Sequence, residues 1–162
     1  MSNCTLFIRG ANGTAEPATA EQILAAARHV LSHRVRRGAT LSSPQDVRDF
    51  LAVRLGHLDY EVFSLVLVDQ RHRLIEYVEL FRGTIDGASV HPREVVKLVL
   101  EKQAAACLIV HNHPSQVGEF SQADELITKR LISVLQSIDV RVLDHFLVTG
   151  GTVVSMAELG RL

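Results

Sequence analysis

The residues best suited to chemistry lie together in the segment HNHPSQVGEFSQAD, residues 111–124. His111 and His113 stand two positions apart at the end of an apolar run. On a strand they would point to the same face, about 6.5 to 7 Å apart, so two imidazoles can converge on one metal ion. If Ser121 caps a helix, Asp124 occupies its third position, from which a carboxylate can reach back towards the strand end.

Two neutral nitrogens and one carboxylate oxygen form a ligand set that catalytic zinc uses, with a fourth position left for water. Zinc lowers the pKa of such a water to about 7, which makes it a nucleophile at neutral pH. Part of this pattern also has a structural interpretation, because Ser121-x-x-Asp124 is a capping box. The two roles are compatible, and the spacing leaves both open.

A hydrolytic site also needs a base that takes a proton from the water. Glu61 is one candidate, because it begins a strongly apolar strand in which a charge is unexpected. Spacing does not choose between the competing carboxylates, which are Glu61, Glu76, Glu79, Asp86 and Glu119.

The segments around this motif have the pattern of a mixed α/β domain. Two aliphatic, β-branched runs separated by a short polar turn predict an antiparallel pair of strands. Further strands then alternate with helices that begin at Pro92 and Ser121, in the order ββαβαββ, which predicts a sheet with helices packed on it. The expected strands are 61–69, 73–81, 106–113, 140–151 and 152–159, with a possible extended stretch at 83–90, and the expected helices are 91–104 and one from 121 onwards.

The sequence before this domain differs from the rest, and we divide the chain into an N-terminal tail with a short helix at 1–41 and the main domain at 42–162. The short helix is expected at 20–38. Its basic end, 33–38, could touch phosphates, although a solvated helix end is the commoner explanation. A second helix is expected from Pro44 to just before Gly56, capped by Ser43.

Composition is that of an ordinary soluble globular protein, because 47% of the 162 residues are hydrophobic and 22% are charged. The net charge of -1 gives no overall field that would attract nucleic acid or a membrane surface. Cys4 and Cys107 do not form a disulfide framework. The start lacks the pattern of a signal peptide, and no apolar stretch is long enough to span a membrane, so a cytoplasmic location is expected.

Glu61 followed by His111-x-His113-x7-Ser121-x2-Asp124 resembles the signature of the JAB/MPN+ (JAMM) metalloproteases. The segments EVFSLVLVD, LFRGTIDGASVHPREVV, HNHPS, SQAD and RVLDHFLV together resemble the RadC-like branch of that family, over roughly 42–162. The resemblance implies a cytidine-deaminase-like α-β-α sandwich with a mixed sheet. It also implies one zinc ion held by His111, His113 and Asp124.

The mechanism implied by the resemblance is hydrolysis of a peptide bond, or of an isopeptide bond to a lysine side chain, in a protein or peptide substrate. Glu61 would be the general base and would later protonate the leaving amine. Ser121 would stabilise the tetrahedral oxyanion. Neither the substrate nor the oligomeric state can be predicted from the sequence.

The chain departs from the usual RadC-like pattern at two loop positions and at its N-terminus. Gln116 stands where the family commonly has glycine, and Phe120 where it commonly has proline, which puts the shape of the loop in question. The N-terminal helix-hairpin-helix module of longer RadC proteins is not expected in the first 40 residues, which indicates a short form. His145, between apolar strand residues, is expected to make a structural hydrogen bond.

Two other functional hypotheses are compatible with the sequence. One is a non-catalytic interaction scaffold, which the complete set of expected ligands argues against. The other is a DNA-associated repair or recombination factor, which would bind DNA in a salt-dependent way.

Overall fold

A computed structural model describes residues 5–9, 13–34, 44–83 and 90–162. The order ββαβαββ predicted for the main domain is confirmed from β3 to β7. Along the chain the elements are β1 (Phe7–Arg9), β2 (Ala15–Pro17), α1 (Ala20–Arg34), α2 (Pro44–Leu55), β3 (Val62–Val68), β4 (Leu74–Arg82), α3 (Pro92–Glu101), β5 (Ala106–Asn112), α4 (Gln122–Gln136), β6 (Arg141–Thr149) and β7 (Thr152–Ser155).

The main domain is built on a five-stranded mixed sheet with the strand order β4-β3-β5-β6-β7. Strand β3 is antiparallel to both β4 and β5, β5 is parallel to β6, and β6 is antiparallel to β7. The parallel pair requires a crossover connection, and α4 supplies it. Strand β5, which carries His111, therefore lies in the middle of the sheet.

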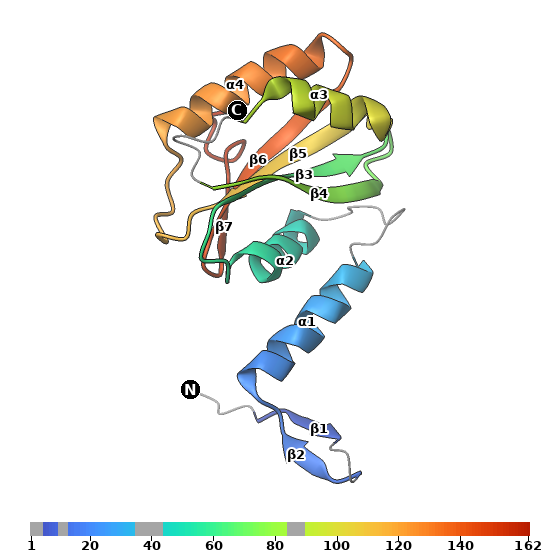
Figure 1. The fold of residues 1–162 in the computed structure, drawn as a ribbon, viewed down its shortest axis with the longest axis vertical. Coiled ribbons are helices and arrows are strands. Elements are labelled where there is room, and N and C mark those ends of the chain that lie inside the picture. Colours follow the sequence, from blue (N-terminus) through green and yellow to red (C-terminus); the bar gives the residue numbers. More distant parts are fainter. Residues whose placement is uncertain (1–4, 10–12, 35–43, 84–89) are drawn as a thin grey trace.

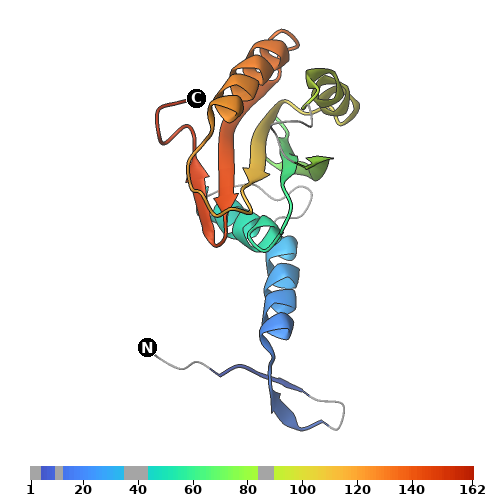
Figure 2. The same ribbon diagram turned by 60° about the vertical axis from the view of Figure 1, so that its left-hand side comes forward.

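Helices cover both faces of this sheet. Figures 1 and 2 show α3 and α4 on one face and α2 on the other. Alternating residues of β3 divide between the two faces, so that Leu65 packs in the core beneath α3 and α4 while Val66 packs against α2. Every residue of β3 and β5 is buried. The predicted α/β class and layered α-β-α arrangement are confirmed.

Helix α2 has the bounds that its end signals predict. It begins at Pro44, where a fixed φ and a missing N–H suit the first helical position, and it ends at Leu55, just before Gly56. Ser43, its expected cap, lies outside the described residues. The apolar stripe of the helix is buried against the sheet and consists of Val47, Phe50, Leu51 and Leu55.

Three features of the fold are not predicted from the sequence. Helix α3 is buried at Val95 and Val99 only, and Leu100 is 55% exposed. In α4, the apolar residue Leu126 is 61% exposed. The polar segment before α1 contains a short hairpin, β1–β2, that the sequence does not predict because its strands have three residues each and are largely exposed.

Some expected features cannot be placed. Most of the extended stretch at 83–90 and of the basic segment at 33–38 lies outside the described residues. In the part of the chain that the structure describes, no helix combines the length and the apolar character needed to cross a bilayer.

Gly56, directly after α2, lies against the turn that joins β6 to β7. A Cβ atom on Gly56 would lie 1.8 Å from the carbonyl oxygen of Gly150 and 2.5 Å from that of Ala52. We expect Gly56→Ala to lower the free energy of unfolding by about 3 kcal/mol, because these backbone atoms cannot move aside without shifting the turn. Urea denaturation measures the change. Gly118→Ala is the control, since its nearest neighbour would be 3.8 Å away, and equal effects of the two changes would contradict the prediction.

Cys107 is fully buried in β5, and burial raises the pKa of its thiol to about 12. Because the thiolate is the reactive form of cysteine, we expect Cys107 to resist Ellman's reagent in the native protein and to react fully in denaturant. The Cys4→Ser variant isolates this thiol for the measurement. Rapid labelling of the native variant would show that β5 is not held in the core as described.

Candidate metal centre

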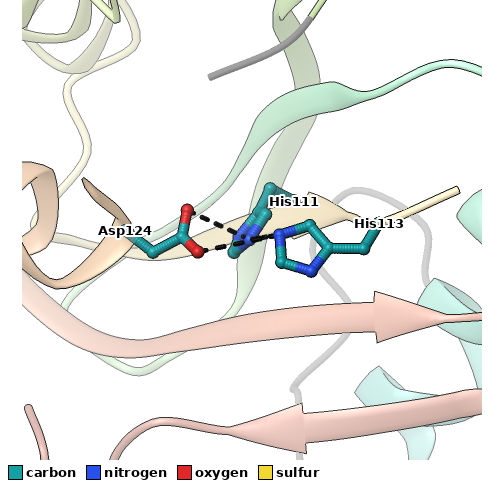
Figure 3. Close-up of side chains that lie close together, drawn as sticks. All are labelled: His111, His113 and Asp124. Carbon is teal, nitrogen blue, oxygen red and sulfur yellow. Dashed lines mark hydrogen bonds and ion pairs between the residues drawn. The ribbon is translucent and has the colours of Figure 1, made fainter. Parts of the chain in front are cut away.

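Three side chains meet where the end of β5 faces the first turn of α4. His111 is the penultimate residue of β5, His113 follows the end of that strand, and Asp124 is the third residue of α4. The N–H of His113 donates to the carbonyl oxygen of Val148 on β6 (3.0 Å), so its backbone remains tied to the sheet. Figure 3 shows the carboxylate of Asp124 directed at the two imidazole rings. The expectation that both rings share one face holds, with their centroids 4.8 Å apart.

The distances between these side chains suit a single small cation. His111 Nε2 lies 3.1 Å from His113 Nε2 and 3.3 Å from Asp124 Oδ1, and His113 Nε2 lies 3.6 Å from Asp124 Oδ2. In a tetrahedral zinc site with bonds of about 2.0 to 2.2 Å, neighbouring ligand atoms lie about 3.3 to 3.6 Å apart. The three residues could therefore hold one ion with little movement.

The carboxylate of Asp124 also caps its own helix. Ser121 Oγ accepts a hydrogen bond from the Asp124 N–H (3.2 Å), and Asp124 Oδ2 accepts from both the N–H (2.7 Å) and the hydroxyl (2.8 Å) of Ser121. The capping box is thus present beside the histidine cluster, as the sequence allowed. The second oxygen, Oδ1, is buried and accepts no hydrogen bond. A buried acceptor without a donor is costly, and a cation beside His111 would satisfy it.

The electrostatics of the cluster favour positive charge. Burial acts to raise the pKa of Asp124, but the neighbouring His111 and His113 rings and the hydrogen bonds from Ser121 outweigh it and hold the pKa far below its ordinary value. The pKa of His113 is raised, chiefly by Asp124 and further by the carbonyl of Val117 and the charge of Glu61. An ionised carboxylate therefore faces the rings, and a proton or a metal ion can bind between them.

Each histidine uses its second ring nitrogen for another contact. His113 Nδ1 donates to the carbonyl oxygen of Val117 (3.0 Å). His111 Nδ1 lies 2.7 Å from His145 Nε2, and His145 Nδ1 lies 2.6 Å from Thr128 Oγ1. The hydrogen bond expected for His145 is therefore present, and its partner is one of the candidate ligands. Burial holds the pKa of His145 well below its ordinary value.

Glu61 directly precedes β3, and its charge contributes to the raised pKa of His113. The pairing of Phe63 with His111 between β3 and β5, continued by two residues, places Glu61 opposite His113. Residues two apart on a strand share a face, so Glu61 is on the side of the sheet that carries the two histidines. The side chain of Asn112 holds the strands together here, because its amide donates to the Tyr60 carbonyl (2.9 Å) and its oxygen accepts the N–H of Val62 (2.8 Å).

The other carboxylates considered as bases are placed differently. Glu76 forms an ion pair with Lys102 (3.0 Å), and Glu79 contacts Arg54 (3.2 Å). Glu119 is exposed, and Asp86 lies outside the described residues. Among the candidates that are described, Glu61 is the one whose charge contributes to the pKa of a candidate ligand, His113.

The two unusual loop residues have clear structural roles. Gln116 has a φ of 60°, in the left-handed region that glycine adopts easily, and its N–H donates to the His113 carbonyl (3.1 Å). Phe120 is 7% exposed, and its ring centroid lies 5.8 Å from that of His111 and 5.2 Å from that of His145. The loop therefore keeps a turn typical of glycine and covers the histidines with an aromatic ring.

Thr128 is a site residue that the sequence reasoning did not single out, and Phe120 was considered there only for its effect on the loop. Thr128 is buried and stands four residues after Asp124, one helical turn further along α4. This spacing could have drawn attention to it. The proximity of Phe120 to the rings carries no comparable signal in the sequence, because it depends on the path of the loop.

Comparison with known proteins agrees with the fold. A model of the RadC-like JAB domain matches residues 41–161. The chain is 51% identical over 148 residues to a UPF0758 protein of Marinobacter nauticus, 52% identical over 150 residues to one of Thioalkalivibrio sulfidiphilus, and 54% identical over 134 residues to one of Shewanella amazonensis.

These matches cover 91%, 93% and 83% of this chain and 66%, 67% and 60% of the three relatives. The chain thus spans roughly two thirds of the length of the curated relatives it matches. Because the family model covers well over half of the chain and the relatives are more than half identical to it, the chain belongs to the RadC-like JAB domain family.

Proposed function

We propose that this chain is a zinc-dependent hydrolase of the JAMM type that cleaves a peptide or isopeptide bond. The observation that supports it best is the convergence of His111 Nε2, His113 Nε2 and the ionised Asp124 carboxylate, one oxygen of which is buried without a hydrogen-bond donor. Bound zinc would supply a water with a pKa of about 7 and polarise the carbonyl of the substrate. One zinc ion per chain is proposed.

The proposed base is Glu61, which would accept a proton from the attacking water and deliver it to the nitrogen of the leaving amine. Its place opposite His113 supports this role, because a base must reach the water beside the ligands. Ser121 is proposed to donate its hydroxyl hydrogen to the oxyanion that forms on the substrate carbonyl. In the structure this hydroxyl donates to Asp124 Oδ2 (2.8 Å), so it would have to turn during the reaction.

The alternative of a non-catalytic scaffold is less favoured, because such a protein has no need for three inward-facing ligand side chains. The alternative of a DNA-associated factor has no support from the net charge of -1, and the basic segment proposed for it lies mostly outside the described residues. A flat titration with single-stranded and duplex DNA at low salt would exclude the latter.

We expect the purified protein to bind one equivalent of zinc, removable with a chelator. Loss of a hydrogen bond that supports a ligand weakens metal binding about 10- to 100-fold. Asp124→Asn should weaken zinc binding by more than this, because it removes a charged ligand. The amide oxygen of the asparagine can still cap α4, so the helix should remain intact. Competition with a chromogenic chelator measures the affinity. Asp139→Asn makes the same chemical change at an exposed position and should have no effect. Equal zinc affinity in both variants would contradict the ligand assignment.

We expect Glu61→Gln to reduce hydrolysis by about 10²- to 10⁴-fold while zinc content and thermal stability stay unchanged, because the amide cannot accept the proton. The assay uses a proteome-derived peptide library together with lysine-branched peptides in ¹⁸O-water, with mass spectrometry detecting label in each new carboxylate. Glu119→Gln, which makes the same change at an exposed carboxylate on the loop between β5 and α4, is the matched control. A zinc-loaded protein that cleaves neither class of substrate would contradict the proposed function.

A further inference from the structure

A chain of buried hydrogen bonds connects two of the candidate ligands behind the site. It runs from His111 Nδ1 to His145 Nε2 (2.7 Å), from His145 Nδ1 to Thr128 Oγ1 (2.6 Å), and from Thr128 Oγ1 to the backbone carbonyl of Asp124 (2.6 Å). His111 and His145 are completely buried, and Thr128 is 1% exposed. These contacts join β5, β6 and α4 at one place.

The last link of this chain fixes the direction of the one before it. The Asp124 carbonyl oxygen can only accept, so the hydroxyl hydrogen of Thr128 is donated to it. A threonine hydroxyl has a single hydrogen. The short contact between Thr128 Oγ1 and His145 Nδ1 is therefore a hydrogen bond in which the imidazole N–H donates.

The protonation of the His145 ring then determines which ring nitrogen of His111 carries a hydrogen. The two ring nitrogens of His145 face Thr128 and His111, neither of which carries a negative charge, so this fully buried ring is neutral. Since its Nδ1 holds the one hydrogen, its Nε2 is a bare acceptor. It accepts from His111 Nδ1–H, and His111 Nε2 is left with a lone pair that faces Asp124 and His113.

We propose that Thr128 and His145 are positioning residues that hold His111 in the Nδ1–H tautomer and so make its Nε2 available to a metal ion. In the opposite tautomer the hydrogen on Nε2 would occupy the centre of the ligand cluster and exclude the ion. The part of this inference that concerns metal rests on the proposed function, whereas the tautomer is a property of the protein alone.

The test compares Thr128→Val, which removes the hydroxyl at nearly constant shape, with Thr128→Ser, which keeps it. Long-range ¹H–¹⁵N correlation spectra of metal-free protein at pH about 9, above the ordinary histidine pKa of about 6.5, distinguish a ring N–H from a bare ring nitrogen. We expect wild type and Thr128→Ser to show Nδ1–H tautomers of both His111 and His145. Thr128→Val should show a mixture, because His145 no longer has an acceptor that selects its Nδ1–H form.

Zinc affinity provides the second measurement. We expect Thr128→Val to weaken zinc binding about 10- to 100-fold, the usual cost of losing support behind a ligand, and Thr128→Ser to stay close to wild type. Unchanged tautomers and unchanged affinity in Thr128→Val would overturn the proposal, as would an Nε2–H form of His111 in the wild type.

The result separates this proposal from the proposed function. If zinc binds and Thr128→Val weakens it but no substrate is cleaved, the positioning role stands and the hydrolase assignment fails. If zinc does not bind at all, the proposed function and the part of the proposal that concerns metal both fail. The spectra then still decide whether Thr128 selects the tautomer.

Discussion

The candidate metal centre brings together imidazole nitrogens and a carboxylate, which repel one another unless a cation or a proton lies between them. His113 Nδ1 donates to Val117 and His111 Nδ1 contacts His145, so the facing Nε2 atoms lie 3.1 Å apart beside an ionised carboxylate. Asp124 Oδ1, which accepts no hydrogen bond, is 3.3 Å from one of them. Such a cluster of acceptors costs folding energy in a buried place. The surrounding fold must hold it together until a cation or a proton offsets that cost.

The sheet and α4 provide this support from three directions. Strand β5 is central and buried on both faces, with β3 antiparallel on one side and β6 parallel on the other, so the backbone at His111 cannot shift alone. The parallel pairing also requires a crossover connection, which contains α4. Helix α4 begins beside the end of β5, and this places Asp124 next to the two histidines. The capping box then fixes the Asp124 carboxylate, because Ser121 donates to it from both its backbone N–H and its hydroxyl. The same hydrogen bonds therefore cap α4 and hold Asp124 in position as a candidate ligand.

Much of the fold was predictable because its signals are local. Pro44 and Gly56 mark the ends of α2, the apolar runs of β3 and β5 fit buried strands, and the spacing from His111 to Asp124 fits a strand, a loop and a capped helix. The arrangement behind the ligands was not predictable. Thr128 meets His145 only because β6 pairs in parallel with β5 in one register. The same is true of Phe120, whose packing on the two histidine rings depends on the path of the loop rather than on residue spacing.

The capping box also bears on the role proposed for Ser121. Its hydroxyl and its backbone N–H both donate to Asp124 Oδ2, at 2.8 and 2.7 Å. If the hydroxyl turned towards a substrate oxyanion, Asp124 would keep the backbone donor, and the helix would lose only part of its cap, whose whole value is about 1 kcal/mol. The backbone N–H cannot leave in this way without unwinding the first turn of α4. Ser121 can therefore keep its backbone hydrogen bond to Asp124 while its hydroxyl changes partners. An alanine at this position would keep the backbone hydrogen bond and lose the hydroxyl.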